Sequence, residues 1–114
     1  MAFSELELAR VHRTMESYIA RRRPRPEIRQ QLDIGYSVES QSVILHEDRQ
    51  LYDGSRLLKP VAKATWVRMQ KVWKIFWMRA DLRWHSYEPL AKAHTLDKVL
   101  EGIDADPYGC CFWG

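Results

Sequence analysis

Apolar residues recur at helical spacing near the start of the chain. The positions that would share one helix face lie three or four residues apart: Leu8, Val11, Met15, Tyr18 and Ile19. Ser4 and Glu7 have the spacing of a capping box, in which each side chain accepts a hydrogen bond from the other residue's backbone amide. Pro24 and Pro26 cannot continue a helix. The pattern predicts a helix over about residues 4–23.

Residues 31–47 follow a different period, in which apolar and polar side chains alternate. This is the pattern of strands that bury one face. A turn at Glu39–Ser40 would join two strands and pair Tyr36 with Val43. The stretch therefore predicts an antiparallel hairpin.

A second alternating stretch covers about residues 60–87, after a polar loop. Its middle is rich in aromatic and β-branched residues, which favour strands. Turns at Gln70–Lys71 and Asp81–Leu82 would divide it into three strands. The second turn would place Arg79 opposite Trp84, where the guanidinium can lie over the indole ring.

The chain then returns to helical spacing. The residues that would share a buried helix face are Leu96, Val99, Leu100 and Ile103. Thr95 is a suitable N-cap, so the pattern predicts a helix over about residues 95–104, followed by an ordered tail at 105–114. The order is helix, antiparallel strands, helix. This predicts one α+β domain over residues 1–114, with a sheet of four to five strands and the two helices in a second layer.

Composition narrows the class of protein. The 114 residues include 46% apolar residues and five Trp, which is enough for a core built on aromatic side chains. No apolar run approaches the ~20 residues of a membrane span, and no signal peptide is recognisable at the N-terminus. Cys110 and Cys111 are adjacent, so they form no spaced disulfide framework. We therefore expect a cytoplasmic protein without a membrane partner.

Basic residues concentrate in one segment, although the net charge is only +3. The segment RRRPRPEIR supplies the candidate anion-binding side chains Arg21, Arg22, Arg23, Arg25 and Arg29. Guanidinium groups bind phosphate bidentately, so nucleic acid is a possible partner. Lys63 and Lys74 also lie among tryptophans, as in surfaces that stack single-stranded bases.

A small group of residues could carry enzyme chemistry. Asp81 precedes His85 by four residues, and a carboxylate that orients a histidine is a common acid–base device. Glu47, Asp81 and Lys63 could also serve a nuclease-like site. The simpler interpretation is that Asp81 caps its own turn. No metal or cofactor is expected, because the His and Cys spacing fits no zinc motif.

Aromatic residues supply the leading interpretation. Both faces of the strand around residues 72–80 are apolar, and one layer of helices covers only one face of a sheet. The remaining surface predicts a self-associating binding module, a homodimer or a complex with a protein partner. The candidate interface residues are Trp73, Trp77, Trp84, Phe112 and Trp113. Nucleic-acid binding is the second interpretation and a small hydrolase the third.

Three stretches resemble one bacterial family of short proteins, known as domain of unknown function 3024. They are WMRADLRWHSYEP, LDIGYSVESQSVIL and DADPYGCCFWG. Members of that family favour an Asp-Gly turn where this chain has Glu39–Ser40. The resemblance implies a small bacterial domain and assigns no catalytic residue.

Overall fold

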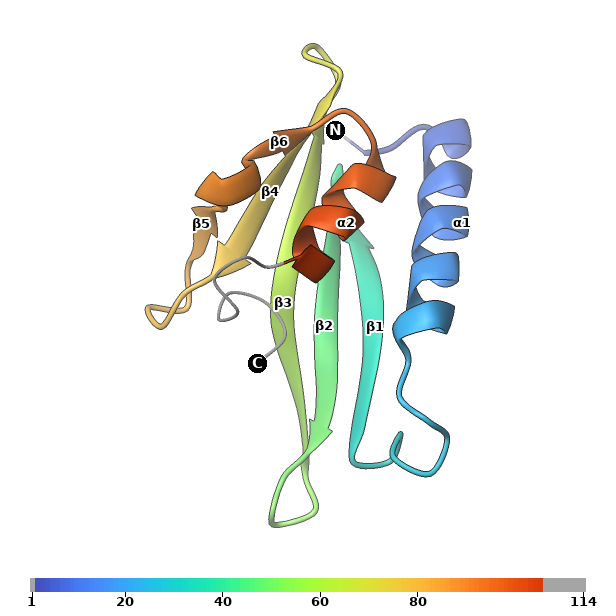
Figure 1. The fold of residues 1–114 in the computed structure, drawn as a ribbon, viewed down its shortest axis with the longest axis vertical. Helices are drawn as coiled ribbons and strands as arrows, with labels where there is room; N and C mark the ends of the chain where they lie inside the picture. Colours follow the sequence, from blue (N-terminus) through green and yellow to red (C-terminus); the bar gives the residue numbers. More distant parts are fainter. Residues whose placement is uncertain (1, 106–114) are drawn as a thin grey trace.

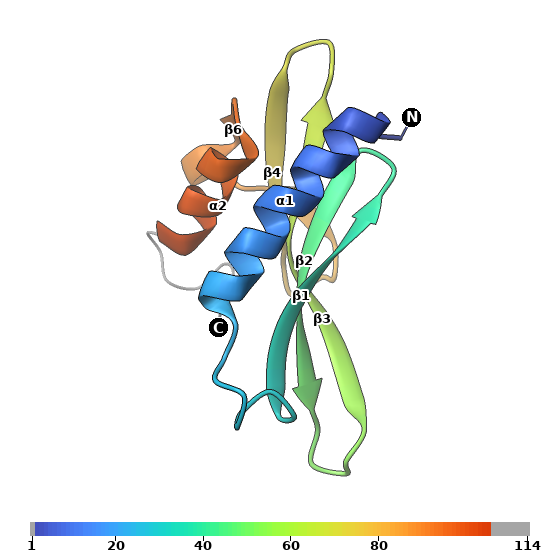
Figure 2. The same cartoon turned by 90° about the vertical axis from the view of Figure 1, so that its right-hand side faces the viewer.

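The computed structural model describes residues 2–105 and has an α+β architecture, as predicted. Its elements are α1 (Glu5–Arg22), β1 (Leu32–Glu39), β2 (Ser42–Gln50), β3 (Arg56–Val67), β4 (Val72–Met78), β5 (Trp84–Ser86), the 3₁₀ turn η1 (Glu88–Leu90), β6 (Lys92–Ala93) and α2 (Leu96–Ala105). The antiparallel sheet has the order β1-β2-β3-β4-β5, and β6 also pairs with β4 (Figure 1). Both helices lie on the same side of the sheet (Figure 2).

Both helices begin where the sequence predicts. The Ser4 hydroxyl accepts a hydrogen bond from the Glu7 amide at 3.2 Å, and the Ser4 amide donates to the Glu7 carboxylate at 2.9 Å. The capping box is therefore confirmed. At α2, the Thr95 hydroxyl accepts from the Lys98 amide at 3.2 Å. These caps satisfy amides that the first helical turn leaves unpaired.

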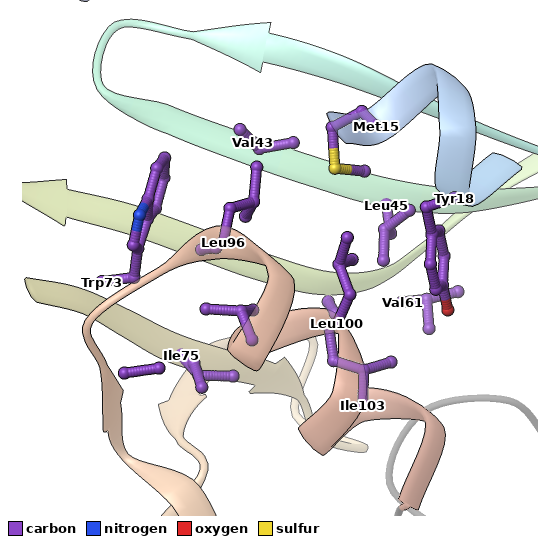
Figure 3. Close-up of a cluster of buried hydrophobic side chains, with 14 of the residues drawn as sticks. Met15, Tyr18, Val43, Leu45, Val61, Trp73, Ile75, Leu96, Leu100 and Ile103 are labelled. Carbon is purple, nitrogen blue, oxygen red and sulfur yellow. The ribbon is translucent and has the colours of Figure 1, made fainter. Parts of the chain in front are cut away.

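The core lies between the helices and the near face of the sheet. Met15 and Tyr18 of α1 face Leu45 of β2 and, across the core, Ile103 of α2 (Figure 3). Tyr18 also donates its hydroxyl hydrogen to Asp104 at 2.8 Å, which ties the end of α1 to the end of α2. Each fully buried apolar side chain contributes roughly 1.5–3 kcal/mol to folding.

The first hairpin differs in register from the prediction. Its turn residues are Ser40 and Gln41, and Tyr36 pairs with Leu45 instead of Val43. Ser40 has φ of 54°, which is the left-handed conformation that a tight two-residue hairpin turn requires. A shift of two positions preserves the side-chain alternation, so the predicted faces remain correct.

The last hairpin differs by one position, and this changes the faces. Its loop spans residues 80–82, with Leu82 at φ of 61°. The left-handed third residue is typical of three-residue hairpin loops. Trp84 consequently pairs with Met78, so the predicted Arg79–Trp84 contact is wrong. The Arg79 guanidinium instead lies 5.4 Å from the centre of the Trp77 ring.

The strands also extend beyond their predicted ends. The predicted loop at residues 48–59 is largely strand, because β2 continues to Gln50 and β3 begins at Arg56. The result is a long β2–β3 hairpin that projects past the helices (Figure 1). The β3–β4 loop spans residues 68–71, which is longer than the predicted turn.

The outer edge of β4 carries an interrupted strand that the sequence did not reveal. The Tyr87 amide donates to the Ile75 carbonyl at 2.9 Å, and the Ile75 amide donates to the Ala91 carbonyl at 3.0 Å. Between these two bonds the chain makes the turn η1. The edge is therefore split into β5 and β6.

Candidate binding site on the open face of the sheet

Side-chain alternation separates the sheet into two different faces. Leu45, Ala64 and Ile75 are buried beneath the helices. Their chain neighbours must point the other way. Both helices lie on the opposite side, so no described helix covers this second face (Figure 2). We call its central part the outer face, formed by Ile44, Lys63, Lys74, Phe76, Met78, Trp84 and Lys92.

The centre of the outer face is a lysine between two aromatic rings. Lys63 of β3 pairs directly with Phe76 of β4, and Trp84 of β5 pairs with Met78, two residues further along β4. The Lys63 ammonium nitrogen lies 5.9 Å from the centre of the Phe76 ring and 5.9 Å from that of the Trp84 ring. Each distance is within the range of cation–π attraction. All three residues are partly exposed, so a ligand can reach them.

The charged residues of the outer face are all lysines. Strands β3 to β6 contain no acidic residue. Lys74 pairs directly with Lys92, and like charges in directly opposed cross-strand positions are destabilising. On the β3 side, Lys74 pairs with Thr65, whose hydroxyl forms a hydrogen bond with the Ser42 hydroxyl at 2.7 Å. The outer face therefore combines aromatic rings with lysines that form no ion pair with a carboxylate of β3 to β6.

A second cluster surrounds His85, whose pairing with Trp77 puts it on the opposite face from Trp84. His85 Nε2 lies 2.8 Å from Asp81 Oδ2, while Asp81 Oδ1 accepts the Arg83 amide at 3.0 Å. Hydrogen bonds from His85 and then from the Arg83 backbone hold the pKa of Asp81 below its ordinary value. Because an ionised carboxylate only accepts, a neutral His85 carries its proton on Nε2. The carboxylate thus both orients the histidine and caps its own turn.

This histidine borders a hollow of about 330 Å³ that Trp77, Arg79 and Glu88 also line. The other acidic candidate is elsewhere. Glu47 of β2 is 3% exposed and pairs with Arg49 at 2.9 Å. Within residues 2–105, no three His, Cys, Asp or Glu side chains are grouped to hold a metal ion. The structure therefore brings Asp81 and His85 into contact, whereas Glu47 forms its ion pair elsewhere, with Arg49.

The five candidate arginines make contacts within the chain. Arg22 lies 3.5 Å from Asp104, and Arg25 lies 3.9 Å from Glu27. The Arg29 side chain donates to the Pro24 carbonyl at 2.8 Å.

Arg23 donates two hydrogen bonds to Asp33, at 2.9 and 2.7 Å. These bonds hold the pKa of Asp33 below its ordinary value. The Arg21 guanidinium lies 5.8 Å from the centre of the Tyr18 ring. Much of the positive charge in this segment is thus matched by carboxylates, which distinguishes it from the outer face.

The candidate interface tryptophans separate into different environments. Trp73 is 7% exposed and packs against Trp66, with 5.3 Å between ring centres, so it belongs to the core. Trp77 faces the helix side, and Trp84 lies on the outer face. Phe112 and Trp113 lie outside the described residues.

The sequence-based candidates omitted four residues of the outer face: Ile44, Phe76, Met78 and Lys92. Phe76 shares a face with Lys74 by simple alternation, so the signal was present in β4. Lys92 lies on the two-residue strand β6, which is too short to produce a periodic pattern. Lys63 and Lys74 were identified, but their aromatic neighbours on the outer face are Phe76 and Trp84, since Trp66, Trp73 and Trp77 point to the helix side.

The fold and this surface define a two-layer α+β protein with one basic and aromatic sheet face that no helix within residues 2–105 covers. Residues 3–114 match the family described as Domain of unknown function (DUF3024). The chain belongs to this family. No curated protein and no solved structure matches it. Among the described residues, no helix has the length and apolar character needed to cross a bilayer.

Proposed function

We propose that this protein is a binding module that holds single-stranded nucleic acid on its outer face. The observation that carries the proposal is the position of Lys63, 5.9 Å from the ring centres of both Phe76 and Trp84. Bases stack on aromatic side chains, while lysines contact the phosphates between them. Lys74 of β4 and Lys92 of β6 extend the positive charge across these two strands.

A single strand fits this surface better than a duplex. Stacking on Phe76 or Trp84 requires an exposed base face, and a duplex hides its base faces within the helix. Stacking contributes about 1–3 kcal/mol for each base, and it tolerates different sequences because every base has a flat face. An anionic partner would also offset the repulsion between Lys74 and Lys92.

The test is a binding titration with labelled single-stranded and duplex oligonucleotides at two or more salt concentrations. Trp84→Ala should weaken single-strand binding by about tenfold, which corresponds to one lost stacking contact. Lys63→Gln should reduce the salt dependence by about 0.7 in logarithmic slope, the value expected for one phosphate contact.

Arg25→Gln is the matched charge control. It also removes one exposed cation, but from the arginine segment predicted from the sequence. It should leave affinity nearly unchanged. If Arg25→Gln weakens binding and Lys63→Gln does not, the binding site is the arginine segment. If no oligonucleotide binds at low salt, the proposal is wrong.

Self-association is a second candidate function, and we propose it for another surface. Pairing two outer faces about a twofold axis would bring their lysines together, at a cost in repulsion. The observation that favours self-association lies on the β2–β3 hairpin. Its tip and arms expose the apolar side chains Leu51, Tyr52, Leu57 and Leu58.

A further inference from the structure

The lower part of β3 is an open strand edge. β4 pairs with β3 only from Ala62 to Val67, whereas β2 pairs with β3 down to Arg56. No other described strand pairs with residues 56–61 on their free side. Figure 1 shows this part of β3 projecting past the end of β4. Unpaired backbone groups at such an edge are a template for another strand.

The other two edges of the sheet are either flanked by a helix or interrupted. α1 runs beside β1 in both views (Figures 1 and 2). Side chains join the two elements: His12 Nδ1 lies 2.6 Å from the Tyr36 hydroxyl, and Arg23 bonds Asp33. At the opposite edge, β5 and β6 are only three and two residues long. Short or covered edges resist pairing, so the open part of β3 is the exception.

Apolar side chains gather at this same edge. Leu57 is 44% exposed and Leu58 is 60% exposed. Leu51 and Tyr52 are exposed at the nearby tip of the hairpin. Together they are four of the seven large apolar side chains that the described residues expose. Exposed apolar side chains beside an unpaired backbone indicate a protein interface.

The direction of the backbone groups on β3 follows from that on β2. The Gln50 amide donates to the Gln31 carbonyl on the β1 side. Because amides alternate along a strand, the neighbouring Arg49 turns its backbone groups toward β3, where it pairs with Leu57. The backbone groups of Leu58 therefore point to the free edge. Those of Arg56 and Pro60 do the same, and proline has no amide hydrogen to leave unpaired there.

We propose that this edge binds the same edge of a second copy, in antiparallel register with Leu58 opposite Leu58. This inference rests on the proposed self-association. In this register each Leu58 amide donates to the Leu58 carbonyl of the other copy. Each Arg56 amide donates to the carbonyl of Pro60. The register uses the two amides that face the free edge and needs none from Pro60.

Charge favours a second copy over an anionic or cationic partner. The hairpin from residue 46 to residue 60 has no net charge, since its acids match its bases: Glu47, Asp48 and Asp53 against Arg49, Arg56 and Lys59. The proposed register also sets Leu57 opposite Lys59, so no like charges face each other. Self-pairing here meets none of the repulsion expected between two outer faces. Pro60 limits pairing to a short stretch, which favours a closed dimer.

The test is sedimentation equilibrium of the full chain over a range of concentrations. Wild type should associate to a dimer. Leu58→Lys, which sets two ammonium groups against each other at the twofold axis, should raise the dimer dissociation constant by about tenfold or more. Leu58→Pro removes the amide that faces the free edge and should give the same result. Circular dichroism verifies that each variant folds.

Met69→Lys is the matched control, since it adds the same charge at an exposed apolar side chain of the β3–β4 loop, away from the β2–β3 hairpin. It should dimerise like wild type. A strictly monomeric wild type would overturn self-association itself. A wild-type dimer that survives both Leu58 substitutions would overturn only the β3 edge as its interface. Trp84→Ala should leave the dimer intact, which separates this surface from the nucleic-acid proposal.

Discussion

Neighbouring residues on β4 occupy opposite environments. Ile75 is 1% exposed and lies beneath α2, whereas Phe76 lies on the outer face beside Lys63. Both are large and apolar, so hydrophobicity alone does not distinguish them. What differs is what the topology places over each face: two helices on one and none of the described helices on the other. One strand therefore carries both the core and the candidate binding surface.

The comparison predicts its largest effect for a matched pair of truncations. Ile75→Ala should lower the free energy of unfolding by about 2–5 kcal/mol, because it removes buried atoms and leaves a cavity. Phe76→Ala should cost about 1 kcal/mol, because its ring is already partly in water. Urea denaturation of both variants measures the difference.

Oligonucleotide affinity should follow the opposite order. Phe76→Ala should weaken single-strand binding more than Ile75→Ala does, provided that both proteins are folded at the temperature used. If Ile75→Ala and Phe76→Ala lowered the free energy of unfolding equally, Phe76 would be as well packed as the core residue Ile75. Equal affinities would remove Phe76 from the binding surface.

The sequence predicts the faces of this sheet better than its registers. Helical spacing and caps identified both helices, because those signals are local. The positions of the turns were harder to predict from the sequence. Ser40, Lys71 and Leu82 all have positive φ without being glycine, so the residue type did not mark them.

The consequences of the two register errors were unequal. Moving the first hairpin by two positions changed no face. Moving the last by one position exchanged the surroundings of His85 and Trp84, and with them the composition of the candidate site. The pairing of Lys63 with Phe76 also depends on contacts between distant strands, which local patterns do not contain.

A second prediction concerns the β1–β2 part of the sheet, on the side away from the helices. Gly35 pairs with His46, and a Cβ added to Gly35 would lie 2.7 Å from the His46 ring. Gly35→Ala should therefore destabilise the protein by about 1 kcal/mol, the lower end of the overpacking range, because the ring can shift.

The double variant sharpens this prediction. In a His46→Ala background the clash is absent, and alanine is better than glycine within a strand by about 0.5–1 kcal/mol. Gly35→Ala should then be neutral or stabilising. Urea denaturation of the four proteins gives the coupling between the two sites. Additive effects would show that the His46 ring does not limit the space for a side chain at position 35.

The smallest predicted effect concerns the arginine segment, where several guanidinium groups form ion pairs with carboxylates. The hydrogen bonds from Arg23 lower the pKa of Asp33 in the folded state. A lowered folded pKa means that this pair stabilises the protein fully above the unfolded pKa of about 3.9. The contribution disappears as the pH falls through the lower, folded pKa. Arg23→Gln should thus destabilise the protein at pH 7 and make little difference at pH 2.

Arg25→Gln separates pairing from charge in this test. Its partner, Glu27, is 3.9 Å away and both side chains are largely exposed, so its loss should change stability little at either pH. Urea midpoints at the two pH values compare the variants. An equal loss at both pH values for Arg23→Gln would mean that the arginine acts through packing of its stem. A loss confined to neutral pH would show that Arg23 stabilises the fold through its ion pair with Asp33.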